Sequence, residues 1–291
     1  MIKLLHVAAA VGALTASGAL ASAVQAQEVE IEDAVARVVV IPEDRTDVAV
    51  TVDQGASGLP AIEVHRRGDN VHIDGGLRRS IQNCQSAAFV SDPTQMPDGV
   101  LVSVRGHGTV EMAQAPLIVI RTPRAVHVSA DGAVWGTVGR SQTVELAAGG
   151  CGDWVVGNTT GELSVALGGS GEMRTGTAQS ADVAIGGSGS VSTAAIGGSV
   201  DIAIGGSGDV SVASVAGPTD VAIAGSGSVR IGGGRAPRLD VTIAGSGDVA
   251  MDGVVGDLSA SVVGSGDIRV AAVTGRVDRS ILGSGELHVG P

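Results

Sequence analysis

Aromatic residues are almost absent from this sequence. Its 291 residues include no tyrosine, one phenylalanine and two tryptophans, which are Phe89, Trp135 and Trp154. Aromatic side chains supply the flat apolar surfaces on which bases and other planar groups stack. The sequence therefore excludes an extended stacking platform for nucleobases and leaves very little for one that binds sugars.

Basic residues are also scarce. Lys3 is the only lysine, and 18 basic residues stand against 30 acidic ones, which gives a net charge of −12. A surface of this charge repels a phosphate backbone, and the sequence contains no basic stripe with interleaved aromatic residues. We therefore expect no nucleic-acid partner.

Long apolar runs are absent except at the start of the chain. Lys3 precedes the apolar run Leu4–Ala23, and Val24-Gln25-Ala26 is a small-x-small cleavage site before Gln27. This pattern predicts a signal peptide over residues 1–26. An uncleaved anchor helix is the alternative, but a run of mostly Ala, Gly and Ser holds a membrane weakly. We expect an exported mature chain without a membrane span, located in the periplasm or cell envelope or outside the cell.

Only two cysteines are present, Cys84 and Cys151. In an oxidising compartment such a pair usually forms a disulfide, and two buried free thiols are the alternative. Neither cysteine belongs to a CxxC pair, so zinc-ligand spacing is missing. We predict a Cys84–Cys151 disulfide.

Glycine, in contrast, is abundant, with 46 residues against nine prolines. A Gly-Ser-Gly motif followed by an acid or a serine recurs at intervals of 18 to 20 residues. A fixed period of this length is typical of stacked repeats. The motif begins at Gly169, Gly187, Gly206, Gly225, Gly245, Gly264 and Gly283.

Aliphatic residues recur at fixed positions around each motif, two and four residues before it and four and six residues after it. The spacing of two within each run indicates strands with one face turned inward. Around Gly245 these positions hold Ile243, Val241, Val249 and Met251, and Arg279 breaks the second column in the last repeat. We predict an all-β fold, a parallel β-solenoid that is right-handed by the crossover rule. An antiparallel sandwich of hairpins is the alternative.

The repeat continues backwards from Gly169 to Gly150-Cys151-Gly152-Asp153 and to a degraded copy at Asp131-Gly132-Ala133. In this alignment Trp135 and Trp154 occupy equivalent positions and should stack in successive coils. We therefore predict a signal peptide at 1–26, an irregular N-terminal β-module at 27–115 and a solenoid with GSG/GSGD corners at 116–291.

Acidic residues form two columns in the repeat. The first column stands three residues after the start of the motif and includes Asp209, Asp248, Asp267 and Glu286. The second column stands five residues before the motif and includes Asp182, Asp201, Asp220 and Asp240. Calcium could bridge a ladder of carboxylates, so the first set is a candidate for metal binding. The preferred interpretation is a set of solvated turn residues at strand starts. We therefore expect no metal and no other cofactor.

No catalytic constellation is evident. His65, His72, His107, His127 and His288 are dispersed, and no Gly-Ser-Gly copy has the context of a nucleophile elbow. Polysaccharide lyases and hydrolases with β-helix folds combine clustered acids with basic and aromatic residues, and the repeat array has no lysine. We therefore expect a protein without catalytic residues, and a carbohydrate-active enzyme is the alternative.

The predicted leader, the early segment Ile31–Val35, the Gly150–Trp154 corner and the serial GSGD coils together resemble the head-GIN domain family of auto-transporter adhesins. The resemblance implies a β-solenoid with an adhesive or cell-envelope role and supplies no catalytic residues. An auto-transporter also needs a membrane barrel of amphipathic strands, whereas the solenoid pattern here continues to Val289. We expect that the chain does not export itself by that route.

These observations predict an exported, non-catalytic structural, adhesive or binding module of the bacterial cell envelope. Its partner would be an envelope component, either a glycan or a protein. A calcium-dependent scaffold is a further alternative. The last repeat, Ser280–Val289, could also present an unpaired strand edge and support self-association.

Overall fold

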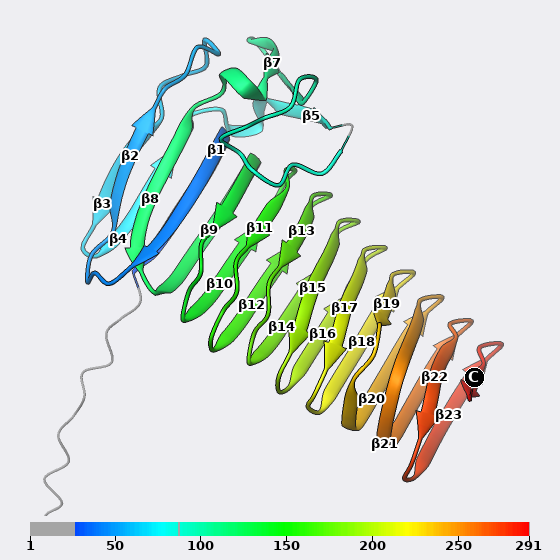
Figure 1. Cartoon of the computed structure of the whole chain (residues 1–291). Helices are drawn as coiled ribbons and strands as arrows, with labels where there is room; N and C mark the ends of the chain where they lie inside the picture. The colour runs from blue at the N-terminus through cyan, green and yellow to red at the C-terminus, as the bar shows by residue number, and fades with distance from the viewer. Residues whose placement is uncertain (1–26, 87, 291) are drawn as a thin grey trace, which may run out of the picture.

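The computed structural model describes residues 27–86 and 88–290, so the predicted signal peptide lies outside the described residues. The described chain is a long stack of about nine turns of roughly 19 residues (Figure 1). Successive turns pair through parallel strands. This confirms the predicted parallel β-solenoid and excludes the sandwich of hairpins. Among the described residues, no helix is long and apolar enough to cross a membrane.

Each regular coil contributes one strand to each of two parallel faces. The first face contains β10 (Thr143–Ala148), β12 (Glu162–Leu167), β14 (Ser180–Ile185), β16 (Val200–Ile204), β18 (Thr219–Gly225) and β20 (Arg235–Gly245). The second face contains β11 (Trp154–Val156), β13 (Glu172–Thr175), β15 (Ser190–Ile196), β17 (Asp209–Val215) and β19 (Ser228–Ile231). In the last coils β21 (Asp248–Gly264) runs through both faces and is followed by β22 (Ile268–Val273), β23 (Val277–Gly283) and β24 (Leu287–Val289).

The four predicted aliphatic columns form the core between the two faces. Val241, Ile243, Val249 and Met251 are all buried, and their equivalents in neighbouring coils are buried with them. A single coil cannot enclose its own apolar face, so each coil is stabilised by stacking on its neighbours. The intervening polar residues face outward, as the alternation along a strand requires.

The glycines at the corners allow consecutive coils to approach closely. A Cβ atom at Gly245 would lie 2.2 Å from the carbonyl oxygen of Gly225, and one at Gly225 would lie 2.2 Å from that of Gly206. Gly245 also has φ +138°, a conformation that L side chains rarely adopt. At its two glycine positions, the corner formed by the repeated motif thus leaves no room for a side chain.

The predicted stacking of the two tryptophans is wrong. Trp154 pairs with Gly136, so the step between these coils is 18 residues and Trp135 is equivalent to Asp153. Trp154 lies in the solenoid core, whereas Trp135 belongs to a separate cluster outside it. A shift of one residue transfers a side chain to the opposite face of a strand.

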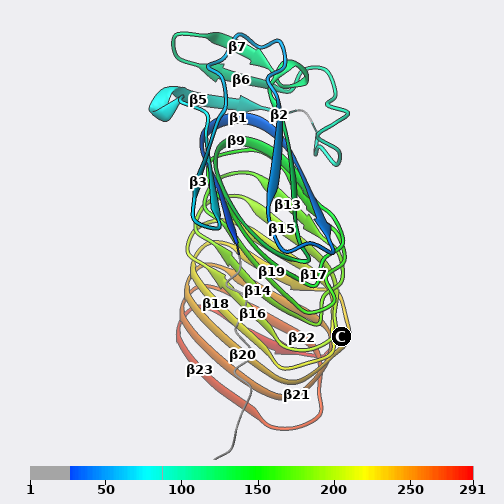
Figure 2. The same cartoon turned by 90° about the vertical axis from the view of Figure 1, so that its left-hand side faces the viewer.

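The first strand lies between coils that follow it in sequence. The start of β1 (Glu28–Glu43) pairs with β4 (Asn70–Asp74), its end pairs with β8 (Leu117–Pro123), and its opposite edge pairs with β9 (Ala125–Val138). β2 (Ala49–Asp53) and β3 (Glu63–Arg67) pair antiparallel with β8 and β4 and cover the outer edge (Figure 2). The N-terminal strands are therefore continuous with the solenoid and close one end of it.

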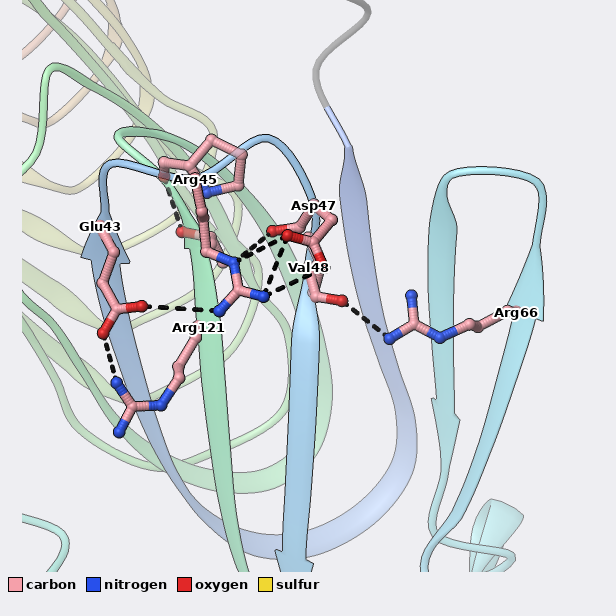
Figure 3. A network of polar contacts seen from close by, with 8 residues as sticks. Glu43, Arg45, Asp47, Val48, Arg66 and Arg121 are labelled. Atoms are coloured by element: carbon pink, nitrogen blue, oxygen red, sulfur yellow. Dashed lines mark hydrogen bonds and ion pairs between the residues drawn. The ribbon is translucent and has the colours of Figure 1, made fainter.

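Ion pairs hold this closed end together (Figure 3). Glu43 at the end of β1 pairs with Arg121 of β8 and with Arg45, and Arg45 contacts Asp47 at 3.1 Å. Arg66 of β3 donates a hydrogen bond to the Val48 carbonyl oxygen at 2.7 Å. The network links β1, β8 and the strands that cover them.

A small antiparallel sheet lies over one corner of the first coils. It consists of β5 (Ile81–Gln85), β6 (Leu101–Val104) and β7 (Gly108–Glu111), with short 3₁₀ turns at Arg78–Ser80 and Met112–Gln114. Its apolar side packs against Trp135 and Val35 in a second hydrophobic cluster. Cys84 of β5 forms a disulfide with Cys151, which confirms the predicted bridge and fastens the sheet to the coil corner.

The last described coil is less enclosed. Leu282 is 73% exposed, and Arg279 of β23 occupies the column that holds Ala260 and Val241 in the preceding coils. A charge at an inward position discourages an edge strand from pairing with another chain. Self-association through this coil stays a prediction.

Candidate functional site

A row of four aspartates crosses the first face of the solenoid. Asp182 on β14 aligns with Asp201 on β16, which aligns with Asp220 on β18 and then with Asp240 on β20. The residues on either side of each aspartate face the core, so the carboxylates point outward. We call Asp182, Asp201, Asp220 and Asp240 the acidic row.

Three members of the acidic row, Asp182, Asp201 and Asp220, line a shallow groove of about 420 Å³ that runs across the coils. Two residues beyond each aspartate the outer face carries a small side chain, and these side chains form the floor of the groove. They are Ala184, Ala203, Ala222 and Thr242, and Ala166 takes the equivalent place beyond Ser164 in the preceding coil. The same pair of side chains is therefore presented in successive coils, which lie about 4.8 Å apart.

Partial burial and mutual repulsion raise the pKa of three carboxyls in the row. Burial is the main cause at Asp182, Asp201 and Asp220, followed at each by a neighbouring acid, which is Glu162, Asp182 or Asp240 respectively. Arg238 offsets part of this charge at one end, at 2.7 Å from Asp240 and 3.9 Å from Asp220. In the described residues no ion pair neutralises Asp182 or Asp201.

Replacing Asp201 with asparagine is expected to stabilise the fold at neutral pH. Stacked carboxylates repel by roughly 1 kcal/mol per pair in water, so the gain should be about 1 kcal/mol at low salt and smaller at high salt. Because folding raises the pKa of Asp201, the folded chain binds protons more readily than the unfolded chain. The contribution of the Asp201 carboxyl to the stability of the parent protein therefore falls as the pH rises from the ordinary aspartate pKa through the raised value.

The measurement is thermal unfolding of both proteins between pH 4 and pH 7. The advantage of Asp201→Asn should be largest at pH 7 and should shrink towards pH 4. A difference that does not depend on pH, or a destabilised variant, would contradict the electrostatic interpretation.

The four carboxylates considered for calcium stand at the coil corners, and three of them accept a backbone hydrogen bond from the next coil. Asp209 accepts from the Ser228 amide at 3.2 Å, Asp248 from the Asp267 amide at 2.9 Å, and Asp267 from the Glu286 amide at 2.8 Å. The acids stand in one column, in which Ser228 separates Asp209 from Asp248 and the later members follow one coil apart. A role for these four residues in calcium binding stays a prediction.

Asp153, which the sequence marks only as part of the Gly150–Asp153 corner, also accepts a backbone hydrogen bond from the next coil. It is 9% exposed, and its two carboxylate oxygens accept from the amides of Val90, at 2.9 Å, and Glu172, at 3.3 Å. Burial raises the pKa of this carboxyl. Beside the disulfide, Asp153 thus ties the segment after β5 to the first regular coils.

Three of the histidines contact glutamates. His65 lies 3.1 Å from Glu63, His72 lies 3.3 Å from Glu30, and His127 lies 2.9 Å from Glu145. Within the described residues, no hydrogen bond joins a histidine to a serine or threonine hydroxyl. Residues 27–86 and 88–290 therefore contain no hydrogen-bonded serine–histidine pair of the kind used in nucleophilic catalysis.

Comparisons with known proteins agree with the fold. Residues 194–290 match the model of the family described as "Putative auto-transporter adhesin, head GIN domain", which confirms the resemblance seen in the repeats. No curated protein matches the sequence. A solved structure described as a "Putative lipid binding protein from Parabacteroides distasonis ATCC 8503" is similar with a TM-score of 0.53 and 16% identity, over 91% of this chain and 93% of that one. At this identity the similarity shows a shared fold.

Proposed function

We propose that the protein is an exported, non-catalytic module of the bacterial cell envelope that binds an extended basic polypeptide along the acidic row. The observation that carries the proposal is the repetition of one carboxylate and one small side chain across successive coils. Such a surface offers a series of equivalent contacts to a linear ligand. The description of the matching family as an adhesin is consistent with a binding role.

The charges of the groove favour a basic ligand. Asp182 and Asp201 have no ion-pair partner among the described residues, so lysine or arginine side chains of a ligand would supply the missing positive charge. The aliphatic stems of those side chains could lie along the alanine floor while the charged ends reach the carboxylates. The residues that line the groove include no aromatic side chain, which favours a polypeptide over a glycan.

The uniformity of the row supports binding over catalysis. Acid–base catalysis by two carboxyls needs environments that hold one protonated and the other ionised. Asp182, Asp201 and Asp220 instead all have pKa values that are raised, chiefly by burial, in equivalent positions of successive coils. No cofactor is part of the proposal.

The test compares two triple variants of the mature chain, Gln27–Pro291. Asp182→Asn/Asp201→Asn/Asp220→Asn changes the acidic row, and Asp209→Asn/Asp248→Asn/Asp267→Asn removes the same charge at the corners. Asparagine retains an oxygen that can accept the corner hydrogen bonds, so the control should fold normally. Binding of a fluorescent ten-residue lysine peptide would be measured by anisotropy at low and physiological salt.

The row variant should bind the peptide at least about tenfold more weakly than the parent, a loss of about 1.4 kcal/mol. The corner variant should change affinity less than about threefold, which is the effect of overall charge alone. Equal losses in the two variants would show that attraction is not localised to the groove and would overturn the proposal.

The main alternative is a carbohydrate-active enzyme with the same fold. It would release reducing ends from a panel of envelope and plant polysaccharides, whereas the binding module should release none. A calcium-dependent scaffold would instead bind calcium with micromolar affinity in calorimetry, and the loss of that binding in the corner variant would identify the site.

A further inference from the structure

Three neighbouring strands at the closed end of the solenoid carry only histidine and carboxylate side chains at six adjacent outward positions. Glu30 on β1 aligns with His72 on β4, which aligns with His65 on β3. One pleat further along, the same strands align Glu32, Asp74 and Glu63. Residues two apart on a strand share a face, so all six side chains lie on one surface.

His72 stands at the centre of this group. Its Nδ1 atom lies 3.3 Å from a carboxylate oxygen of Glu30, and its Nε2 atom lies 4.0 Å from one of Glu32. One ligand atom from each of the three residues can be chosen so that all three lie within 4.8 Å of one another. The ring of His65 stacks beside that of His72, with 6.3 Å between the centroids.

We propose that Glu30, Glu32 and His72 form a binding site for a divalent transition-metal ion, for which Zn²⁺ is the probe. An imidazole with two carboxylates is a donor set that suits zinc, whereas calcium and magnesium prefer oxygen ligands alone. The three positions belong to hydrogen-bonded strands, so the backbone already holds the donors together. Solvent, or His65 from the neighbouring strand, could complete the coordination.

The geometry requires only a modest movement of side chains. Zinc binds nitrogen and oxygen at about 2.0–2.2 Å, so ligand atoms around it lie roughly 3.3 Å apart. The separations seen here are at most 4.8 Å, and the glutamate side chains are about half exposed, at 49% and 50%. They can therefore turn towards a shared ion without displacing the core.

The bound ion would link β1 to β4. The pairing of these two strands connects the first strand to the strands that close the end of the stack. An ion bound only by the folded chain adds to stability by mass action. Zinc should therefore raise the melting temperature by stabilising the pairing of β1 with β4. The inference concerns a different surface from the acidic row and does not depend on its function.

The experiment is calorimetric titration of the mature chain, without a histidine tag, with zinc chloride at pH 7.5, followed by thermal unfolding with and without zinc. We expect one equivalent of zinc to bind with micromolar affinity and to raise the melting temperature. His72→Ala should weaken binding at least about tenfold, and Glu32→Gln should weaken it by a similar factor, while His288→Ala should leave it unchanged. Binding should also weaken as the pH falls, because protons compete with zinc for its ligands.

Glu32→Gln keeps the shape of the side chain, so it tests the site even if His72→Ala is destabilised. Binding weaker than millimolar in the parent protein would overturn the proposal. Micromolar binding that survives both substitutions would also overturn it, because the zinc would then be held elsewhere. Retention of affinity in a large excess of calcium is expected, and competition by calcium would point to an oxygen-only site instead.

Discussion

A Gly245→Ala substitution is expected to destabilise the solenoid by about 3 kcal/mol, through overpacking and an unfavourable backbone conformation together. The new Cβ atom would lie 2.2 Å from the Gly225 carbonyl oxygen, and φ at this residue is +138°. The neighbouring coil cannot move away without lengthening the hydrogen bonds between the parallel strands of the two coils. Denaturant unfolding followed by circular dichroism measures the loss.

Gly186→Ala provides a matched control in the same class of corner. A Cβ atom at Gly186 would meet nothing within 4 Å, and the equivalent position in later coils holds Ala224 and Ala244. This variant should unfold like the parent or be slightly more stable, because alanine reduces the freedom of the unfolded chain. Similar losses in both variants would show that the contact between coils is not the cause.

Removal of the disulfide is the second substitution with a large expected effect. Cys84 and Cys151 are 67 residues apart in sequence, and a closed loop of that length stabilises a fold by about 4 kcal/mol in the chain-entropy model. A Cys84→Ser/Cys151→Ser variant should lose stability mainly in the sheet β5–β7. This sheet has its own small hydrophobic cluster and is fastened to the coils by the bridge.

Hydrogen exchange distinguishes a local effect from a global one. In the serine variant, amides of β5 and β6 should exchange faster, while those of β16 and β18 should keep their protection. Adding a reductant to the parent protein should reproduce the pattern. Uniform loss of protection along the stack would mean that the bridge supports the whole solenoid.

The regular coils could be predicted from the sequence because each coil repeats the same pattern of glycines and aliphatic residues. The glycines mark the corners, and the aliphatic columns around Gly245 mark the residues that face the core. A coil in which one position deviates, such as the last, can therefore still be aligned with the others. Trp135 shows where this fails. Its coil carries only a degraded motif, and one missing residue in the step places the side chain on the other face.

Of the two candidate sites, one could be predicted from the sequence and the other could not. The acidic row follows directly from the repeat, whereas the pairing of Glu30 with His72 joins strands that are not adjacent in sequence. Nothing in the local pattern indicates that residues near 30, 65 and 72 share a surface. The repeat likewise marks Asp153 only as part of a corner, because its contact with the Val90 amide depends on how a distant segment folds over it.

The position of β1 also bears on the order in which the chain can assemble. β1 is the earliest described strand along the chain, yet its partner strands lie in β4, β8 and β9, the last of which ends at Val138. The later coils need only their neighbours some 19 residues away, so their contacts are short-range and fast to form. β1 can pair with β4 over a separation of 42 residues, as in Glu30 and His72, but its other edge is covered only by residues 99 positions later, as in Glu28 and His127. In refolding experiments, protection of the β1 amides should accordingly appear after that of the coils beyond β12.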